Sequence, residues 1–127
     1  YMVAFEQLEA MRYAHWLRPG GVALVSDYRI PPVAVNTGAA RYPSATAQQA
    51  AFAVAGRYWL APAMRMAEEL GNVRVNNVVM LGILAALLPI PLQVWRDLVA
   101  RRVSERYAAL NAEAFDRGLQ WAQGRGD

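Results

Sequence analysis

The hydrophobic pattern at the start of the chain alternates between strand-like and helix-like stretches. Residues 1–5 (YMVAF) form a short apolar run typical of a buried strand. Residues 6–17 follow with apolar positions at helical spacing, and a Pro-Gly-Gly sequence is expected to end that helix. Residues 22–28 (VALVSDY) then form a second apolar run, typical of a strand covered on both faces. Strand, helix, turn and strand in this order predict a βαβ unit, and therefore a parallel sheet.

The next stretch lacks such periodicity. Residues 29–45 carry three prolines and a glycine, which predicts a loop. Thr46 and Gln49 have the spacing of a capping box and predict a helix that begins at Thr46. Residues 57–60 (RYWL) are short and apolar enough for one more strand.

A long apolar run dominates the second half. Residues 78–92 contain no charge, yet the run is shorter than the roughly 18 residues that suggest a membrane helix. A buried helix is therefore expected, preceded by a helix over residues 61–70 that ends at Gly71. Residues 91–103 and 104–123 are expected to be amphipathic helices. The expected buried stripe of the last helix is Ala108, Ala112, Phe115, Leu119 and Ala122.

Composition excludes several kinds of chemistry. The 127 residues include no cysteine, which excludes disulfides, thiolate nucleophiles and cysteine-bound iron–sulfur clusters from this chain. All 13 basic residues are arginine, so Schiff-base and Walker-A lysines are absent as well. The single histidine, His15, is expected on the apolar face of the first helix together with Leu8 and Met11, partly buried rather than catalytic.

The charge pattern favours no polyanionic partner. The net charge of +3 is spread along the chain without a basic block, so nucleic-acid binding is not expected. A secretory signal is not apparent at the start either, and a cytoplasmic, membrane-free protein is the expectation.

Several segments together resemble the γ-type domain of 2-oxoacid:ferredoxin oxidoreductases. They are AFEQLEAMRYAHWLRPGGVALVSDYRIPPVAV, the Tyr42-Pro43 pair, ELGNVRVNNVVMLGIL and LNAEAFDRG, in the family's order and spacing. Within that family the EQLEAMR and RIPP stretches are most similar to the indolepyruvate (arylpyruvate) branch. The resemblance covers nearly the whole chain.

The resemblance implies an α/β fold with a Rossmann-like parallel sheet flanked by helices. It also implies a component of an enzyme that converts a 2-oxoacid and coenzyme A to acyl-CoA and carbon dioxide while reducing ferredoxin. Thiamine diphosphate, magnesium and iron–sulfur clusters are expected on a partner subunit or domain, with no cofactor and no metal on this chain. A contact between two copies is a further expectation.

Two alternatives stay open on this basis. One is the γ subunit of a pyruvate or 2-oxoglutarate oxidoreductase of the same family. The other is a stand-alone module that binds coenzyme A or a nucleotide without catalysis.

The sequence departs from the family pattern at its start. The strand and glycine-rich G-x-G-G-Q-G turn with which the family's domain begins are absent, so no phosphate-binding role is carried over to this chain. A sheet of two or three strands is also too small to bury this much apolar surface. We therefore expect residues 1–127 to be the C-terminal part of a larger domain.

Four residues are candidates for contact with a ligand or partner, and no residue is a candidate for catalysis. Arg29 follows a predicted strand, at the edge where open parallel sheets bind ligands. Tyr42 is expected to shape the following loop or to touch a partner. Asn77 is expected to cap the buried helix and Arg74 to anchor the loop before it, with an anion or a partner segment at that helix start as the functional alternative.

Overall fold

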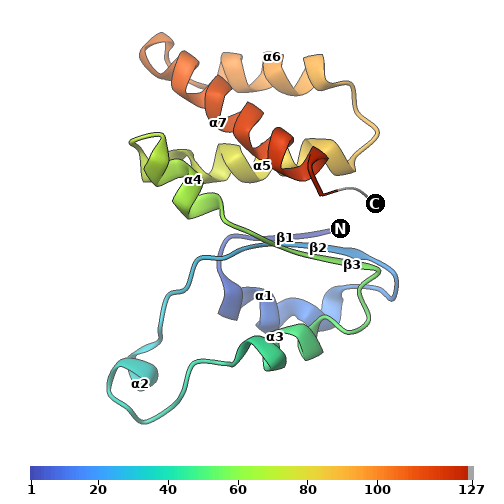
Figure 1. Cartoon of the computed structure of the whole chain (residues 1–127), viewed down its shortest axis with the longest axis vertical. Coiled ribbons are helices and arrows are strands. Elements are labelled where there is room, and N and C mark those ends of the chain that lie inside the picture. Colours follow the sequence, from blue (N-terminus) through green and yellow to red (C-terminus); the bar gives the residue numbers. More distant parts are fainter. Residues whose placement is uncertain (126–127) are drawn as a thin grey trace. The chain divides into compact units, whose positions relative to one another are not determined.

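The chain folds into two compact units, Tyr1–Ala61 and Pro62–Asp127. Figure 1 shows the computed structural model, which describes residues 1–125. The first unit contains a parallel sheet with helices, and the regular elements of the second are helices over the residues described. The predicted α/β class with a parallel sheet is therefore confirmed.

Three parallel strands form the sheet of the first unit. They are β1 (Met2–Ala4), β2 (Val22–Ser26) and β3 (Arg57–Ala61), hydrogen-bonded in the order β1-β2-β3. In the register, Ala23 of β2 lies opposite both Met2 and Tyr58. All three strands lie where the apolar runs predicted them, including the weakly patterned β3.

Both crossover connections lie on one face of the sheet. Helix α1 (Gln7–Tyr13) continues as a 3₁₀ turn, η1 (Ala14–Trp16), and α3 (Ala45–Ala51) lies beside α1 on the same side of the sheet (Figure 1). This follows from topology, because successive right-handed crossovers toward the same edge place their helices on the same face. The core on this face consists of Ala10, Ala14, Leu17, Ala23, Val25 and Phe52.

The buried face of α1 lies one position away from the predicted one. Gln7, Ala10 and Ala14 are buried, whereas Leu8 and Met11 are only half-buried. His15 is exposed and packs edge-on against Trp16, so its predicted partial burial is wrong. The Gln7 side-chain amide donates to the Asp27 carbonyl at 2.6 Å, and this bond places Gln7 on the buried face of α1.

The long loop after β2 contains one helical turn, α2 (Val33–Asn36), and extends away from the sheet (Figure 1). Helix α3 then begins at Ala45, and its N-cap is Ser44, whose hydroxyl accepts from the Ala47 N–H. The predicted start at Thr46 is therefore wrong, since Ser44 provides the cap two residues earlier.

The second unit is a small helical bundle. Its elements are α4 (Ala63–Glu69), the 3₁₀ turn η2 (Val73–Val75), α5 (Asn76–Leu87), α6 (Leu92–Arg102) and α7 (Glu105–Gln123). Gly71 follows α4 with a φ of 81°, a left-handed conformation that glycine adopts without strain, as predicted. Within the described residues 1–125, no helix has both the length and the apolar character to cross a membrane.

Helices α5 and α7 approach each other closely at two glycines. A methyl group added to Gly82 would lie 2.0 Å from the Phe115 carbonyl oxygen, and one added to Gly118 would lie 2.0 Å from that of Val79. Both distances are far shorter than van der Waals contact. The close approach of α5 and α7 therefore requires glycine at both positions. Met80, Ile83 and Phe115 are almost fully buried in this unit.

The buried stripe of α7 follows the prediction only in its C-terminal half. Phe115, Leu119 and Ala122 are buried as expected, but Ala112 is exposed and Ala108 is half-buried. Asn111, Ala114 and Gly118 are buried instead. The glycine contact explains the shift, because it turns the Gly118 face of α7 toward α5.

Candidate functional site

Glu6 connects β1, α1 and the long loop at the carboxyl end of the sheet. It is the N-cap of α1, and its Oε2 accepts from the Glu9 N–H at 2.8 Å. Its Oε1 accepts from the Ile30 N–H at 3.0 Å and from the Tyr42 hydroxyl at 2.8 Å. The residue is only 7% exposed. One carboxylate therefore fixes a helix start and two points of a loop that is distant in sequence.

The protonation of Glu6 reflects a competition between burial and hydrogen bonding. Burial alone would raise its pKa, but the hydrogen bonds from Ile30, Glu9 and Tyr42 outweigh it, and the pKa of the Glu6 carboxyl lies below its usual value. Glu6 is therefore charged at neutral pH.

Arg29 and Tyr42, both predicted from the sequence, lie together beside Glu6. The Arg29 guanidinium carbon is 5.5 Å from the centre of the Tyr42 ring, within the range of a cation–π contact. Its Nε donates to the Gln7 side-chain oxygen at 3.1 Å. We call Glu6, Gln7, Arg29 and Tyr42 the Glu6 cluster.

The Glu6 cluster is suited to positioning rather than to proton transfer. Both Glu6 oxygens already accept hydrogen bonds, which stabilise the charged carboxylate and lower its basicity. The side chain of Arg29 is exposed, and its terminal nitrogens donate to no acceptor within residues 1–125. The cluster thus presents an ordered guanidinium at the edge of the sheet where ligands and partners of parallel sheets bind.

The phenol of Tyr42 provides a direct test of this arrangement. Burial and the hydrogen bond to Glu6 raise the pKa of Tyr42 to about 12. Because the folded pKa lies above the ordinary value, the contribution of this hydrogen bond to stability is complete below pH 10 and is lost as the pH rises through 12. Ultraviolet titration should show one phenol ionising near pH 12 in the wild type and missing in Tyr42→Phe. If the phenol lost in Tyr42→Phe were one that titrates near the ordinary value of 10, that result would contradict the Glu6–Tyr42 bond.

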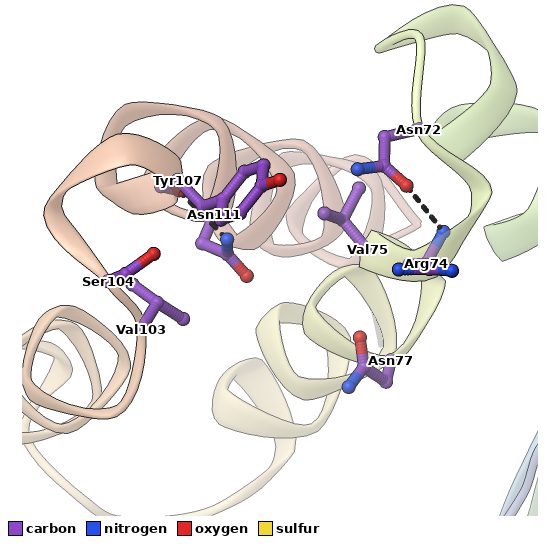
Figure 2. A pocket seen from close by; sticks show the side chains of 8 residues that line it. All are labelled: Asn72, Arg74, Val75, Asn77, Val103, Ser104, Tyr107 and Asn111. Carbon is purple, nitrogen blue, oxygen red and sulfur yellow. Dashed lines mark hydrogen bonds between the residues drawn. The ribbon is translucent and has the colours of Figure 1, made fainter.

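The second candidate site is a pocket of about 260 Å³ in the helical unit. Figure 2 shows its two sides, one formed by the segment around η2 and the start of α5, the other by the start of α7. The lining side chains are Asn72, Arg74, Val75, Asn77, Val103, Ser104, Tyr107 and Asn111. We call it the Arg74 pocket.

The cap of the buried helix differs from the prediction. Helix α5 has Val75 at its N-cap position, without a side-chain bond, and Asn77 lies inside the first turn. The Asn77 Oδ1 accepts only from the adjacent Val78 N–H, at 2.9 Å. Capping is done one turn earlier, where the Asn72 Oδ1 accepts from the Arg74 N–H at 3.0 Å and starts η2. Asn77 as the helix cap is therefore wrong, and its exposed side chain lines the pocket instead.

The four predicted residues thus form two pairs, one in each unit. Arg29 and Tyr42 meet in the Glu6 cluster, while Arg74 and Asn77 line the Arg74 pocket. Sequence reasoning missed Glu6 as the centre of the first pair, because its partners lie 24 and 36 residues further along the chain. It also missed Ser104 and Tyr107, although a serine directly before a helical pattern is a usable signal for a helix start.

Neither candidate site has the ligands of a redox or metal centre. The chain contains no cysteine for an iron–sulfur cluster. Among residues 1–125, no three His, Asp or Glu side chains gather closely enough to hold a metal ion such as the magnesium of thiamine diphosphate.

Curated relatives are similar along almost the entire chain. Indolepyruvate oxidoreductase subunit IorB of Pyrococcus horikoshii is 32% identical over 126 residues, which is 96% of this chain and 62% of that protein. The subunit of the same name from Thermococcus kodakarensis is 29% identical with the same coverage. The chain therefore spans about three-fifths of the length of these relatives.

A solved structure has the same fold. The γ subunit of a keto/oxoacid ferredoxin oxidoreductase from Geobacter sulfurreducens superposes with a TM-score of 0.70 at 22% identity, covering 96% of this chain and 63% of that one. A family model described as pyruvate ferredoxin/flavodoxin oxidoreductase matches residues 1–121. The chain belongs to the pyruvate ferredoxin/flavodoxin oxidoreductase family.

Proposed function

We propose that this chain is part of the γ-type component of a 2-oxoacid:ferredoxin oxidoreductase. The complete enzyme would convert a 2-oxoacid and coenzyme A to acyl-CoA and carbon dioxide, and the released electrons would reduce ferredoxin. The family match over residues 1–121 carries this proposal. An indolepyruvate-type substrate is favoured over pyruvate or 2-oxoglutarate because the curated relatives described above are named for indolepyruvate.

In this proposal the chain contributes binding surface and structure, and a partner contributes the reactive groups. Thiamine diphosphate with its magnesium and the iron–sulfur clusters would reside on a partner subunit or domain. The composition supports this division, since a chain without cysteine and lysine has few of the groups that hold or assist such cofactors. We place the complex in the cytoplasm.

The Glu6 cluster is the part of this chain that we assign to the partner interface. Its exposed guanidinium is held in one direction by Gln7 and Tyr42, and the loop behind it is anchored by Glu6. Arginine and tyrosine are enriched at interfaces, because they combine a large contact area with directional hydrogen bonds.

We also propose that the sheet of the first unit continues beyond β1. A groove beside that edge strand is lined by Tyr1, Tyr13, Trp16 and Arg18, among others. The Trp16 side chain is 77% exposed, which is unusual for a large aromatic residue. A further strand of the longer protein would cover this groove, in agreement with relatives that are longer than the match.

Anoxic purification of the full-length protein from its host tests the assembly. We expect it to retain a brown partner that contains iron, acid-labile sulfide and thiamine diphosphate. Arg29→Ala should weaken retention of that partner, whereas Arg12→Ala, which removes an arginine that pairs with Glu9 on the surface of α1, should not. A colourless protein that purifies alone and binds coenzyme A tightly would contradict the proposal and favour a stand-alone binding module.

A further inference from the structure

We propose that the Arg74 pocket binds the phosphate group of a small-molecule ligand. The pocket lies within the helical unit and does not involve the Glu6 cluster. The proposal concerns binding alone, and it can be tested whether or not the 2-oxoacid reaction is observed.

The charge of the pocket is positive and uncompensated. Arg74 is the one charged side chain among the eight that line it. Its guanidinium has no acceptor within residues 1–125. Three other arginines of this unit are paired, because Arg65 and Arg117 lie 3.8 Å from Glu69 and Arg96 lies 2.8 Å from Asp116. Arg74 is therefore available for an anion that comes from outside the chain.

The neutral side chains of the pocket add hydrogen-bond donors. Ser104 occupies the N-cap position of α7, but its hydroxyl does not cap that helix. The Asn77 oxygen is used by the Val78 N–H, which leaves the amide NH₂ group for another acceptor. The Tyr107 hydroxyl points across the pocket toward the η2 side (Figure 2).

This arrangement favours an oxyanion over a cation or a neutral molecule. A guanidinium, two hydroxyls and an amide NH₂ can all donate, and the lining contains no carboxylate to attract a cation. Arginine with neutral donors is the usual protein environment of phosphate, because its planar fork binds two oxygens at once.

The surroundings indicate that the phosphate belongs to a larger molecule. A second cavity of about 300 Å³ shares Asn77, Val103 and Asn111 with the Arg74 pocket. Leu81 and Leu98 give it an apolar lining, and Arg102 lies at it as well. A ligand with a phosphate in the first cavity and an uncharged, partly apolar extension in the second fits both.

Chemical modification of arginine tests this site residue by residue in the intact protein or complex. Phenylglyoxal reacts with exposed guanidinium groups, and peptide mass spectrometry gives the rate at each arginine. Inorganic phosphate, titrated against chloride at constant ionic strength, should slow the modification of Arg74 several-fold and in a saturable manner. The rate at Arg65, which is exposed and outside the pocket, should not change.

Two serine variants show whether the pocket or the charge alone is responsible. Ser104→Ala should raise the phosphate concentration for half-protection of Arg74 roughly threefold, as expected for one lost neutral hydrogen bond. Ser44→Ala, at the cap of α3, should leave it unchanged. Arg74→Lys, followed by amine labelling of the new side chain, should retain protection at a higher phosphate concentration.

The outcomes separate the proposal from a solvated surface arginine. Unchanged Arg74 reactivity at tens of millimolar phosphate, or equal protection of Arg65, would overturn it. Protection by coenzyme A at lower concentration than by inorganic phosphate would identify the phosphate as part of that larger ligand. Equal potency of the two would identify a free phosphate site.

Discussion

Replacement of Gly118 by alanine is expected to destabilise the full-length protein by about 3 kcal/mol. The new methyl group would meet the Val79 carbonyl oxygen at 2.0 Å and the Val79 carbonyl carbon at 2.9 Å. These are backbone atoms of α5, so no side-chain rotation can relieve the overlap and the two helices must move apart. The higher helix propensity of alanine offsets only about 1 kcal/mol of this cost.

Gly124→Ala is the matched control for this prediction. It lies at the C-terminal end of the same helix, and an added methyl group would meet its nearest neighbour, the Gln120 carbonyl oxygen, at an ordinary 3.5 Å. Urea unfolding of both variants gives the comparison, with Gly124→Ala within about 0.5 kcal/mol of the wild type. Equal stabilities of the two variants would show that α5 and α7 do not pack at this contact.

Replacement of Glu6 by glutamine is expected to cost about 2 kcal/mol and to loosen the loop after β2. Glutamine keeps the length of the side chain but replaces one accepting oxygen with a donor. The Ile30 N–H and the Tyr42 hydroxyl, or else the Glu9 N–H, then lose an acceptor that is itself only 7% exposed. Hydrogen exchange should become faster at the Ile30 amide, and proteases should cut the loop around α2 more readily.

Acid should reproduce part of this effect in the wild type. The pKa of Glu6 is lowered by folding, so its contribution to stability is complete above its ordinary value of about 4.5 and is lost as the pH falls through the lower folded value. Glu9→Gln is the control, because Glu9 is exposed and pairs with Arg12 on the surface. A Glu6→Gln protein with wild-type exchange at Ile30 would refute the role of Glu6 as the anchor of this loop.

The order of strands and helices could be read from the sequence because it depends on local patterns. The run VALVS forms β2 and is mostly buried, and the first part of the uncharged run after Asn77 forms α5, where Val79, Met80 and Ile83 are almost fully buried. Glycine and proline marked the breaks, as at Gly71, where the backbone requires a positive φ. These features are decided by neighbours within a few residues.

The errors arose where distant contacts decide the outcome. Helix α1 buries Gln7 rather than the predicted Leu8, because the Gln7 amide bonds to Asp27, which is 20 residues away. The face of α7 is set by the close approach of Gly118 to α5, and no pattern within α7 alone reveals it. The cap of α5 was misassigned because a 3₁₀ turn started by Asn72 precedes the helix.

The candidate sites were predictable only in part for the same reason. Arg29 and Tyr42 were found from their position after a strand and within a proline-rich loop. That they meet through Glu6 depends on the folded course of that loop. Ser104 and Tyr107 reach the Arg74 pocket only because α7 returns beside the start of α5.

The most direct test of the proposed function is turnover by the assembled complex. The full-length protein, purified anoxically with its partner, should reduce viologen in the presence of indolepyruvate, and only when coenzyme A is also added. Omission of either compound should abolish the reduction, and acyl-CoA and carbon dioxide should form together. The account would be contradicted by a complex with intact clusters that, given coenzyme A, fails to reduce viologen with each of indolepyruvate, pyruvate and 2-oxoglutarate.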